Sequence, residues 1–586
     1  MTITRRTALA TLLAGGAASC SSVPKRTPFV ADNVQASGQF SSGVASGDPR
    51  ADAVIIWTRI GSPIVDSPAG SVGGTALPGN QTVTWAVARD AAFTDIVAEG
   101  TETTGPARDG TVKVDVQGLA PGTSYHYRFD YEGERSPVGR TRTLPVGETS
   151  QARFAVISCS NYPFGHFNVY DQIARDDDLD AVLHLGDYIY EYGRDGYGGD
   201  IGEAIGRGHM PPTEILTLAD YRRRHRQYKS DPSSQAMHAR HPLIPIWDDH
   251  ETANNSWKDG AQNHDPKTEG DWTRRRTAAL QAYYEWMPVR DPVPGMAREA
   301  FFRSFSYGNL MSLAAIETRL MARDQELSYR EAVAGLKTPD DVARYRREVL
   351  NNPNRQMLGT AQLDYLEKVL GGSKQAGQPW RVVANQIIMA KVDAPDLTPY
   401  VTEEEIVALE QEWDQARAFI QASTLGLPTN FDAWDGYPAA RERFFDMVKS
   451  TTNAEGLIVL TGDTHTWWAN DLTDAAGGPV GVELGVASVT SPSPYREEFL
   501  GGKGADYALL TNRHNKDVRY LNGTSRGYID LTVTPEAARA RFVSVDNTQT
   551  TAYNAFDQAA FTISRRAGPA AFSDADGLSF KQGFLF

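Results

Sequence analysis

Residues 242–255 read PLIPIWDDHETANN, and this stretch decides both the fold class and the place of the candidate site. An unbroken apolar run is followed directly by Asp248, Asp249, His250 and Glu251. Such a run is typical of a short strand in a sheet that is covered on both faces. Carboxylates and an imidazole at its end would be costly to desolvate unless a cation compensated them. The stretch therefore predicts a buried strand that ends in a metal site.

The same texture recurs from about residue 150 onward. Further strand-like apolar runs are RFAVISC (153–159), DAVLHLGD (180–187), MSLAAIET (311–318), WRVVANQ (380–386) and GLIVLTGD (456–463). Helix candidates between them are LADYRRRHRQYKS (218–230) and TRRRTAALQAYYEWM (273–287). This layout predicts an α/β or α+β sandwich in which ligands bind at the strand ends.

Residues 40–145 have a different pattern, that of a small all-β module. Its β-rich runs, separated by Gly, Pro and Asn turns, are AVIIWTRI (53–60), QTVTWAVARD (81–90), TVKVDVQGL (111–119) and SYHYRFDYEG (124–133). The segment around Tyr125 resembles the tyrosine corner of immunoglobulin-like and fibronectin-like sandwiches, with Tyr125 supplying the corner hydroxyl.

Length and charge limit the function classes. A chain of 586 residues suggests one small module and one large unit, and 41% hydrophobic residues are enough for a sizeable core. The formal net charge of −15 speaks against binding polyanions by charge alone, so no specific nucleic acid binding is expected. A phosphate-bearing substrate would need local positive charge, and bound metal ions are its natural source.

The N-terminus carries the pattern of an export signal. Arg5 and Arg6 precede a short Ala- and Gly-rich apolar stretch that is too short for a permanent membrane helix. Paired arginines favour the twin-arginine type, and the alternative is an ordinary secretory signal that contains Arg-Arg. Cys20 stands where a lipoprotein signal carries its lipidated cysteine, but Ala17-Ala18-Ser19 lacks the usual larger aliphatic residue, so lipidation is not the expectation. A periplasmic or secreted protein is predicted.

Side chains of metal-ligand type also follow three other strand-like runs. These are Cys159, then Asp187 and Tyr190, then Asp463 and His465. Because ligands of open α/β sheets bind at the carboxyl ends of the strands, these ends are expected to converge on one site.

Several of these residues have a simpler reading. Cys159 is either a ligand or a small buried hydrophobe; with Cys20 in the signal it has no disulfide partner in the chain. Asp187, after Gly186, is a ligand or a turn residue. Asn255 is a neutral oxygen ligand or a helix cap in the first turn of a following helix.

Taken together, Cys159, GDYIY (186–190), WDDHE (247–251) with Asn254-Asn255, and TGDTH (461–465) resemble PhoD-type alkaline phosphatases and phosphodiesterases. These are calcineurin-like metallophosphoesterases related to purple acid phosphatases. The resemblance covers nearly the whole mature chain, beginning with FSSGVASGDP (40–49).

The fold implied by the resemblance is an α/β four-layer metallophosphoesterase sandwich, two mixed sheets flanked by helices, preceded by a small all-β immunoglobulin- or fibronectin-like sandwich. The expected division of the chain is a twin-arginine export signal and linker (1–35), the β-sandwich (36–146), the catalytic domain (150–554) and a C-terminal tail (555–586). The tail either packs on the domain or covers the site as a lid.

The implied cofactors are one ferric ion, Fe(3+), and calcium, Ca(2+). Cys159, Asp187, Tyr190 and His465 would be the iron-side ligands, with Asp187 bridging. The calcium side would be served by Asp248, Asn255 and Asp463, together with Asp249. A thiolate with a phenolate suits ferric iron, and oxygen ligands suit calcium.

The implied reaction is in-line attack on a phosphate ester by a metal-activated hydroxide or oxide. Asp187 and His250 are the predicted catalytic residues. His250 either donates a hydrogen bond to the phosphoryl oxygens or the leaving group, or orients Asp249. Arg319 is a predicted phosphate clamp.

The resulting hypothesis is an exported, monomeric alkaline phosphatase for mono- and diesters that passes through the twin-arginine export machinery. A rival within the family is a phospholipase D-like or wall-polymer phosphodiesterase. A rival from another class is a calcium-binding surface protein without activity, which would leave the thiol, the phenol and the DDHE cluster without a purpose.

Overall fold

The computed structural model describes residues 38–61, 65–67, 70–72, 77–496, 502–565 and 568–573. The predicted export signal (1–35), with Arg5, Arg6 and Cys20, lies outside these residues, as do residues 574–586 of the predicted tail. Within the described ranges, none of the helices combines the length and the apolar character that crossing a bilayer requires.

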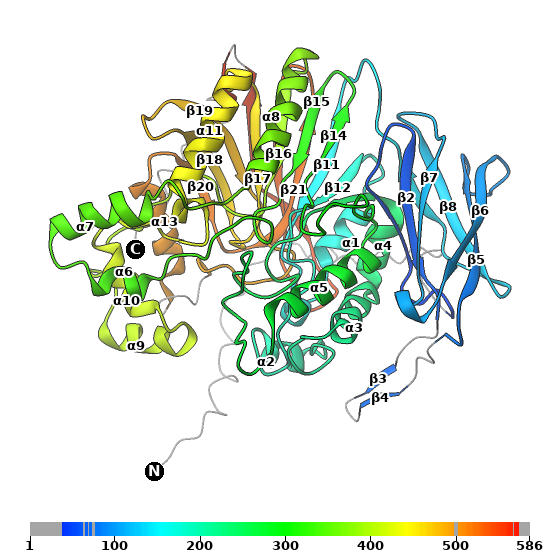
Figure 1. Cartoon of the computed structure of the whole chain (residues 1–586), viewed down its shortest axis with the longest axis horizontal. Coiled ribbons are helices and arrows are strands. Elements are labelled where there is room, and N and C mark those ends of the chain that lie inside the picture. Colours follow the sequence, from blue (N-terminus) through cyan, green and yellow to red (C-terminus); the bar gives the residue numbers. More distant parts are fainter. Residues whose placement is uncertain are drawn as a thin grey trace, which may run out of the picture.

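Two mixed sheets lie face to face at the centre of the molecule (Figure 1). The first sheet has the strand order β24 (Ala571–Phe572), β23 (Ala555–Ser564), β22 (Ala537–Val545), β21 (Arg526–Val533), β11 (Ala152–Ile157), β12 (Ala181–His184), β13 (Pro242–Pro245), β1 (Val44–Gly47), β2 (Ala53–Arg59) and β7 (Thr111–Gln117). The second has the order β14 (Arg303–Tyr307), β15 (Met311–Ala315), β16 (Trp380–Ala384), β17 (Leu457–Thr461), β19 (Pro479–Gly485), β18 (Trp467–Thr473) and β20 (Val518–Asn522).

The core between the sheets explains the unbroken apolar runs of the sequence. Phe154, Leu183 and Ile244 of the first sheet pack in one buried cluster with Val382 and Leu460 of the second. The opposite faces of the same strands pack against helices, so most positions of these strands are buried.

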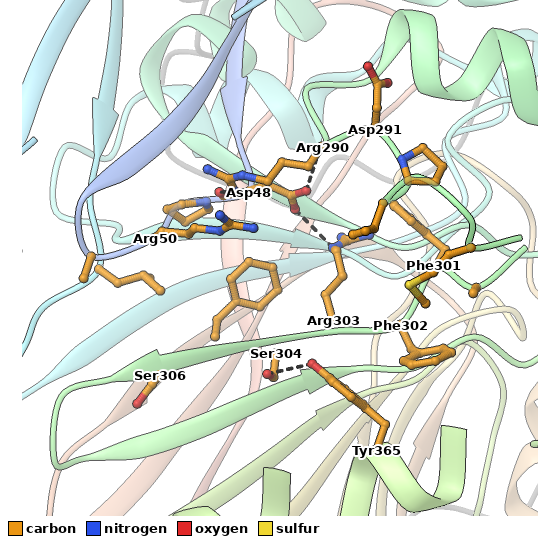
Figure 2. Close-up of a pocket in the computed structure, with 18 of the residues that line it drawn as sticks. Asp48, Arg50, Arg290, Asp291, Phe301, Phe302, Arg303, Ser304, Ser306 and Tyr365 are labelled. Carbon is orange, nitrogen blue, oxygen red and sulfur yellow. Dashed lines mark hydrogen bonds and ion pairs between the residues drawn. The ribbon is translucent and has the colours of Figure 1, made fainter. Parts of the chain in front are cut away.

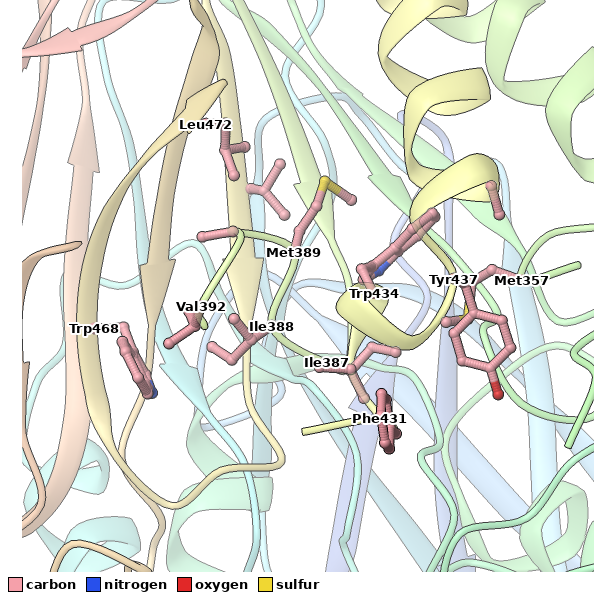
Figure 3. Packing of buried hydrophobic residues seen from close by; sticks show 14 of the residues in the cluster. Met357, Ile387, Ile388, Met389, Val392, Phe431, Trp434, Tyr437, Trp468 and Leu472 are labelled. Carbon is pink, nitrogen blue, oxygen red and sulfur yellow. The ribbon is translucent and has the colours of Figure 1, made fainter. Parts of the chain in front are cut away.

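Helices cover the outer face of each sheet. On the first sheet these are α1 (Asn168–Ala174), α3 (Leu218–Lys229), α4 (Pro232–Arg240) and α5 (Trp272–Trp286). On the second they are α6 (Tyr329–Ala334), α8 (Thr360–Gln375), α10 (Ala416–Ser423), α11 (Pro438–Thr452) and α13 (Gly504–His514). Figure 3 shows part of the second helical layer's core. The predicted four-layer sandwich is therefore confirmed.

Shorter helical segments lie in the connections. These are α2 (Gly199–Ala204), α7 (Pro339–Tyr345), α9 (Glu403–Glu412), the 3-10 turns at Pro106–Arg108, Tyr162–Phe164 and Trp434–Gly436, and a π-helical turn at Arg346–Leu350. The two predicted helices correspond to α3 and α5. Their starts follow from capping: Thr217 and Asp220 form a capping box at α3, and Asp271 accepts from the Arg274 backbone at α5.

The N-terminal module is a sandwich, but one of its two sheets is shared. Its own sheet has the order β10 (Gly139–Arg142), β8 (Ser124–Tyr131), β5 (Gln81–Ala88) and β6 (Ile96–Thr104), with β9 (Glu134–Arg135) beside β8; β3 (Val65–Ser67) and β4 (Gly70–Val72) form a separate hairpin. The facing strands β1, β2 and β7 belong to the ten-stranded sheet. Strand β1 pairs in parallel with β13, Ser46 opposite Pro242.

Two details support this packing. The Tyr125 hydroxyl accepts a hydrogen bond from the Ala120 backbone N–H at 2.8 Å, which confirms the predicted tyrosine corner. At Gly47 a Cβ would lie 2.5 Å from the carbonyl oxygens of both Leu243 and Pro288, so only glycine allows this approach of the chains.

A cavity of about 790 Å³ lies where the module meets the larger unit (Figure 2). Asp48 stands between two arginines there: its carboxylate pairs with Arg303 at 3.1 Å and accepts from the Arg290 backbone N–H at 2.8 Å. Arg290 also pairs with Asp115 at 2.7 Å. These contacts join the two parts of the chain beside the shared sheet.

The start of the predicted C-terminal tail is a strand. Residues from Ala555 to Ser564 form β23, which pairs antiparallel with β22. The tail thus begins as part of the ten-stranded sheet.

Candidate metal centre

The centre forms where strands of both sheets end. The loops that follow β11, β12 and β13 of the first sheet carry Cys159, Asp187 and Asp248, and the loop after β17 of the second carries Asp463. All four side chains are largely buried. The predicted convergence of four strand ends is what the structure shows.

The backbone at the centre is unusual. Five predicted ligands have a positive φ: Cys159 (58°), Asp187 (56°), Asn255 (48°), Asp463 (63°) and His465 (54°). This left-handed conformation is uncommon outside glycine, although Asp, Asn and His tolerate it better than most residues. Such strain persists only where the surroundings enforce it, and it clusters at functional sites.

The first group of ligand atoms contains the thiol. Cys159, Asp187 and His465 each place a ligand atom within 4.8 Å of the others. The Tyr190 hydroxyl donates to Asp187 Oδ2 at 3.0 Å and lies 3.3 Å from His465 Nε2. His465 Nδ1 contacts the Pro492 carbonyl at 2.9 Å, so its Nε2 is left facing the group.

The second group consists of oxygen atoms only. Asp248, Asp249 and Asp463 have carboxylate oxygens within 4.8 Å of one another. Asp187, Asp249 and His250 form a third group under the same limit, so Asp187 and Asp249 connect the thiol-bearing group with the carboxylate group. The arrangement offers two adjacent positions for cations.

Buried oxygens without partners indicate that the side chains fit a cation. Asp187 Oδ1 and Asp248 Oδ2 are buried and accept no hydrogen bond from the chain. Burial, reinforced by neighbouring carboxylates, raises the pKa of Asp187 and Asp463 well above the usual range and that of Asp248 to about 6. A bound cation would supply both the missing partner and the missing positive charge.

The pKa values of the Cys159 thiol and the Tyr190 phenol are shifted by the same causes. Burial and then the Asp187 carboxylate raise the pKa of Cys159 and of Tyr190 well above their ordinary values. Without a cation both side chains are neutral, and a metal would favour the thiolate and phenolate that the resemblance implies.

Arg319 lies among the carboxylates and is fully buried. Its guanidinium contacts Asp248, pairs with Asp432 at 2.7 Å and donates to Asp463 at 3.3 Å. Although burial opposes its charge, these carboxylates hold the pKa of Arg319 above its ordinary value. The side chain predicted as a phosphate clamp is thus already engaged with the ligand carboxylates.

His250 is held by a residue that the sequence analysis did not single out. Its Nδ1 lies 2.7 Å from Glu191 Oε2, and its ring lies over that of Tyr190 with the centroids 4.2 Å apart. Burial opposes protonation, but Asp249 and Glu191 raise the pKa of His250 well above its ordinary value. The imidazole therefore carries a proton toward Glu191 and presents Nε2 on its other side.

Asn255 does not lie in a helix, contrary to the expectation. Residues 251–255 form turns, and the next helix, α5, begins only at Trp272. The Asn255 backbone N–H donates to Asp249 Oδ2 at 2.6 Å, and its Nδ2 donates to Glu326 at 2.7 Å. A left-handed turn therefore places Asn255 beside Asp249, with its amide nitrogen held by Glu326.

Further carboxylates shape the centre. Glu251 accepts from the backbone N–H groups of Asp187 at 3.1 Å and Asp248 at 2.7 Å, so it joins two ligand loops. Glu317 accepts from the Arg319 backbone at 2.8 Å and from Trp247 Nε1 at 3.0 Å.

Part of this supporting set had a signal in the sequence. Glu191 directly follows GDYIY, and Glu317 stands at the end of the strand-like run 311–318, so both lie near strand ends as the predicted ligands do. Asp432 lies in a loop that does not follow a strand, and no local sequence pattern marks it.

Comparisons with known proteins identify the family of the chain. A family model described as PhoD-like phosphatase matches residues 154–542, and one described as PhoD-like phosphatase, N-terminal domain, matches residues 25–145. Alkaline phosphatase D of Bacillus subtilis (strain 168) is 37% identical over 513 residues, 86% of this chain and 77% of that protein. A solved structure of PhoD is 33% identical, with a TM-score of 0.72 over 92% of each chain.

Proposed function

The chain belongs to the PhoD-like phosphatase family and is a phosphoric ester hydrolase, and on that premise we propose that it is an exported alkaline phosphatase acting on phosphate monoesters and diesters. The observation that carries the proposal is the buried cluster of ligand-type side chains at four strand ends. Family membership argues against the alternative of a calcium-binding surface protein without activity.

The proposed cofactors are one ferric ion and calcium. Cys159, Asp187, Tyr190 and His465 would hold the iron, because a thiol, a phenol and an imidazole lie together there. The calcium would be held by oxygen atoms alone, those of Asp248, Asp249, Asn255 and Asp463, with Asp187 shared between the two ions.

Bound metal ions would supply a lowered pKa for a water molecule and positive charge for the phosphoryl oxygens. The chain itself supplies orientation. Glu191 holds His250 Nδ1, so Nε2 is free to donate a hydrogen bond to a phosphoryl oxygen or the leaving group. Because Glu191 and Asp249 favour the protonated imidazole, His250 is suited to donate rather than accept.

Arg319 supports the proposal as a positioning residue. Its contacts with Asp248 and Asp463 fix the direction of two proposed calcium ligands. Direct contact of Arg319 with the phosphate remains a prediction, since its guanidinium already forms ion pairs with three carboxylates.

Export rests on the sequence alone. Arg5 and Arg6 before a short apolar stretch support passage through the twin-arginine machinery to the periplasm or the medium. A monomer is proposed for the mature protein.

The proposal is tested with p-nitrophenyl phosphate and bis-p-nitrophenyl phosphate at alkaline pH. We expect Asp187→Ala to lose at least about a hundredfold in kcat/KM on both esters, because it removes the carboxylate shared by the two ions. Asp259→Ala, an exposed aspartate in a nearby loop, is the matched control and should keep full activity. Full activity in Asp187→Ala would rule out the proposed two-metal centre.

Metal analysis of protein purified after its own export tests the cofactors. Iron together with calcium is the expected result, and Cys159→Ala should lose iron selectively. Zinc alone in the wild type would contradict the proposed ions.

A further inference from the structure

A cavity of about 390 Å³ adjoins the metal centre, with Asp463, Thr464 and His465 in its wall. This volume lies within the range of roughly 300–1,000 Å³ that is typical of small-molecule sites. Whatever fills the cavity would therefore touch the same loop that carries two of the proposed ligands.

The cavity is lined mainly by rings and aliphatic side chains. Its aromatic residues come from separate parts of the chain: Tyr197 from the loop before α2, and Tyr329, Trp413, Phe419, Trp468, Tyr495 and Tyr507. Ile388 and Val392 complete the apolar lining, and Figure 3 shows both beside Trp468.

The rings of the lining pack against one another in two sets. Phe419 of α10 lies 5.3 Å from Tyr329 and 5.4 Å from Trp413 between ring centroids. On the β18 side, Tyr495 stacks on Tyr507 at 4.7 Å and lies 5.9 Å from Trp468. Aromatic contacts of this kind hold the side chains in place, so the cavity is formed before a ligand arrives.

Several polar atoms of the lining already have partners within the chain. Trp468 Nε1 donates to Thr464 at 2.9 Å, and the Tyr329 hydroxyl donates to the Pro428 carbonyl at 2.9 Å. Asp435 accepts from the Val392 backbone at 2.7 Å, and the Thr429 hydroxyl donates to the Val392 carbonyl at 2.8 Å. Asn430 and Arg496 also line the cavity. A polyol that lay among the rings would lose its water and gain few hydrogen bonds there, which is costly.

We propose that this cavity selects the substrate by its alcohol: the preferred phosphate ester carries a single small alkyl or aryl group, which lies among these rings while the phosphate lies at the metal centre. The inference rests on the proposed function and adds the class of substrate. Trp413, Phe419 and Val392 are the specificity-determining side chains, because they line the cavity and are not among the proposed metal ligands.

The test measures binding of n-alkylphosphonates to the metal-loaded protein by isothermal titration calorimetry. Their C–P bond resists hydrolysis, so binding is read without turnover. From methyl- through butyl- to octylphosphonate, Kd should fall by up to about fourfold per methylene group until the cavity is full. The heat-capacity change should become more negative along the series. 2,3-Dihydroxypropylphosphonate should bind at least about tenfold more weakly than propylphosphonate.

Variants locate the effect. Trp413→Ala should reduce the gain per methylene and leave methylphosphonate binding unchanged, and Val392→Phe should weaken octylphosphonate most because it fills part of the cavity. Phe302→Ala is the matched control: Phe302 is half-buried in the other cavity, beside Tyr365 at 5.0 Å, and should change nothing. Circular dichroism checks that the variants fold. If Trp413→Ala does not fold, the result for Val392→Phe tests the cavity proposal.

The outcomes separate the two proposals. If Kd does not depend on chain length, if the dihydroxy compound binds equally well, or if neither folded variant alters the series, the cavity proposal is wrong even when phosphate esters are hydrolysed. If longer phosphonates bind better but no phosphate ester is hydrolysed, the proposed function fails, and with it the substrate class, although the cavity still binds alkyl groups.

Discussion

Individual residues at the centre combine strain with charge. Cys159 and Asp187 adopt left-handed backbone conformations in loops that start directly after buried strands. Gly186, beside Asp187, has a φ of 108°, and a Cβ there would lie 2.4 Å from Asp248 Cβ. The two ligand loops therefore touch at a point where only glycine fits.

Gly186→Ala tests this contact. Both the positive φ and the clash with Asp248 oppose an alanine, so we expect unfolding free energy to fall by about 1–3 kcal/mol and kcat/KM to drop at least about tenfold. Urea titration and steady-state kinetics measure the two effects. Gly118→Ala, at a positive φ with open space around it, should cost some stability and no activity. Equal effects in the two variants would show that strain alone, and not the approach to Asp248, matters.

Arg319 can be examined in the same way. Removing it leaves Asp248, Asp432 and Asp463 buried without their cationic partner, and breaking a buried pair costs about 3–5 kcal/mol. Arg319→Met should therefore be strongly destabilised in chemical denaturation of the metal-free protein. Arg417→Met, which removes an exposed pair with Glu403 and Glu410, should change stability little. If Arg319→Met were as stable as the wild type, the carboxylates would have to be protonated in the metal-free protein.

At the level of elements, one carboxylate ties two loops together. Glu251 follows β13 and accepts from backbone N–H groups of the loop after β12 as well as from its own loop. Its pKa is raised to about 7, because burial outweighs the hydrogen bonds that favour the ionised form. The relative position of the two loops thus depends on a side chain that is not among the proposed ligands.

Glu251→Gln tests the tie between the loops. A glutamine keeps the volume but brings an NH₂ group against backbone donors, so one hydrogen bond is replaced by a repulsive contact. We expect about 10–100-fold weaker metal retention, as for other residues that orient ligands. Metal content after dialysis, read by elemental analysis, is the measurement. Unchanged metal content together with unchanged activity would remove Glu251 from the supporting set.

At the scale of the whole molecule, the N-terminal module and the larger unit share a sheet. Strands β1, β2 and β7 continue the ten-stranded sheet beyond β13, and the Asp48 ion pair crosses the same boundary. A shared sheet couples the folding of its two sides, because separating them exposes unpaired strand edges.

The full mature chain should therefore unfold as one unit. We expect a single transition in differential scanning calorimetry, with the calorimetric enthalpy close to the van't Hoff enthalpy. A chain that begins at residue 150 should be unstable or insoluble, since β13 becomes an exposed edge strand. Two separate transitions, or a stable and active shortened chain, would contradict the coupling.

Much of the candidate site followed from local rules. Apolar runs ending in Cys159, Asp187, Asp248 and Asp463 were recognisable because burial on both faces leaves few polar positions inside such strands. The same rule, applied to Glu191 and Glu317, would have found two supporting residues. The rule could not identify Asp432, because its position in a loop carries no periodic signal.

The layers of the fold, the strand ends that carry ligand-type side chains and the family were predictable from the sequence, since each depends on the order of side chains along a short stretch. The three-dimensional structure was needed to show that Arg319 lies among the carboxylates, that β1 continues the sheet beside β13, and that an aromatic cavity opens beside His465. These three features join residues far apart in the chain. Their geometry arises from packing of whole elements, which no local pattern encodes.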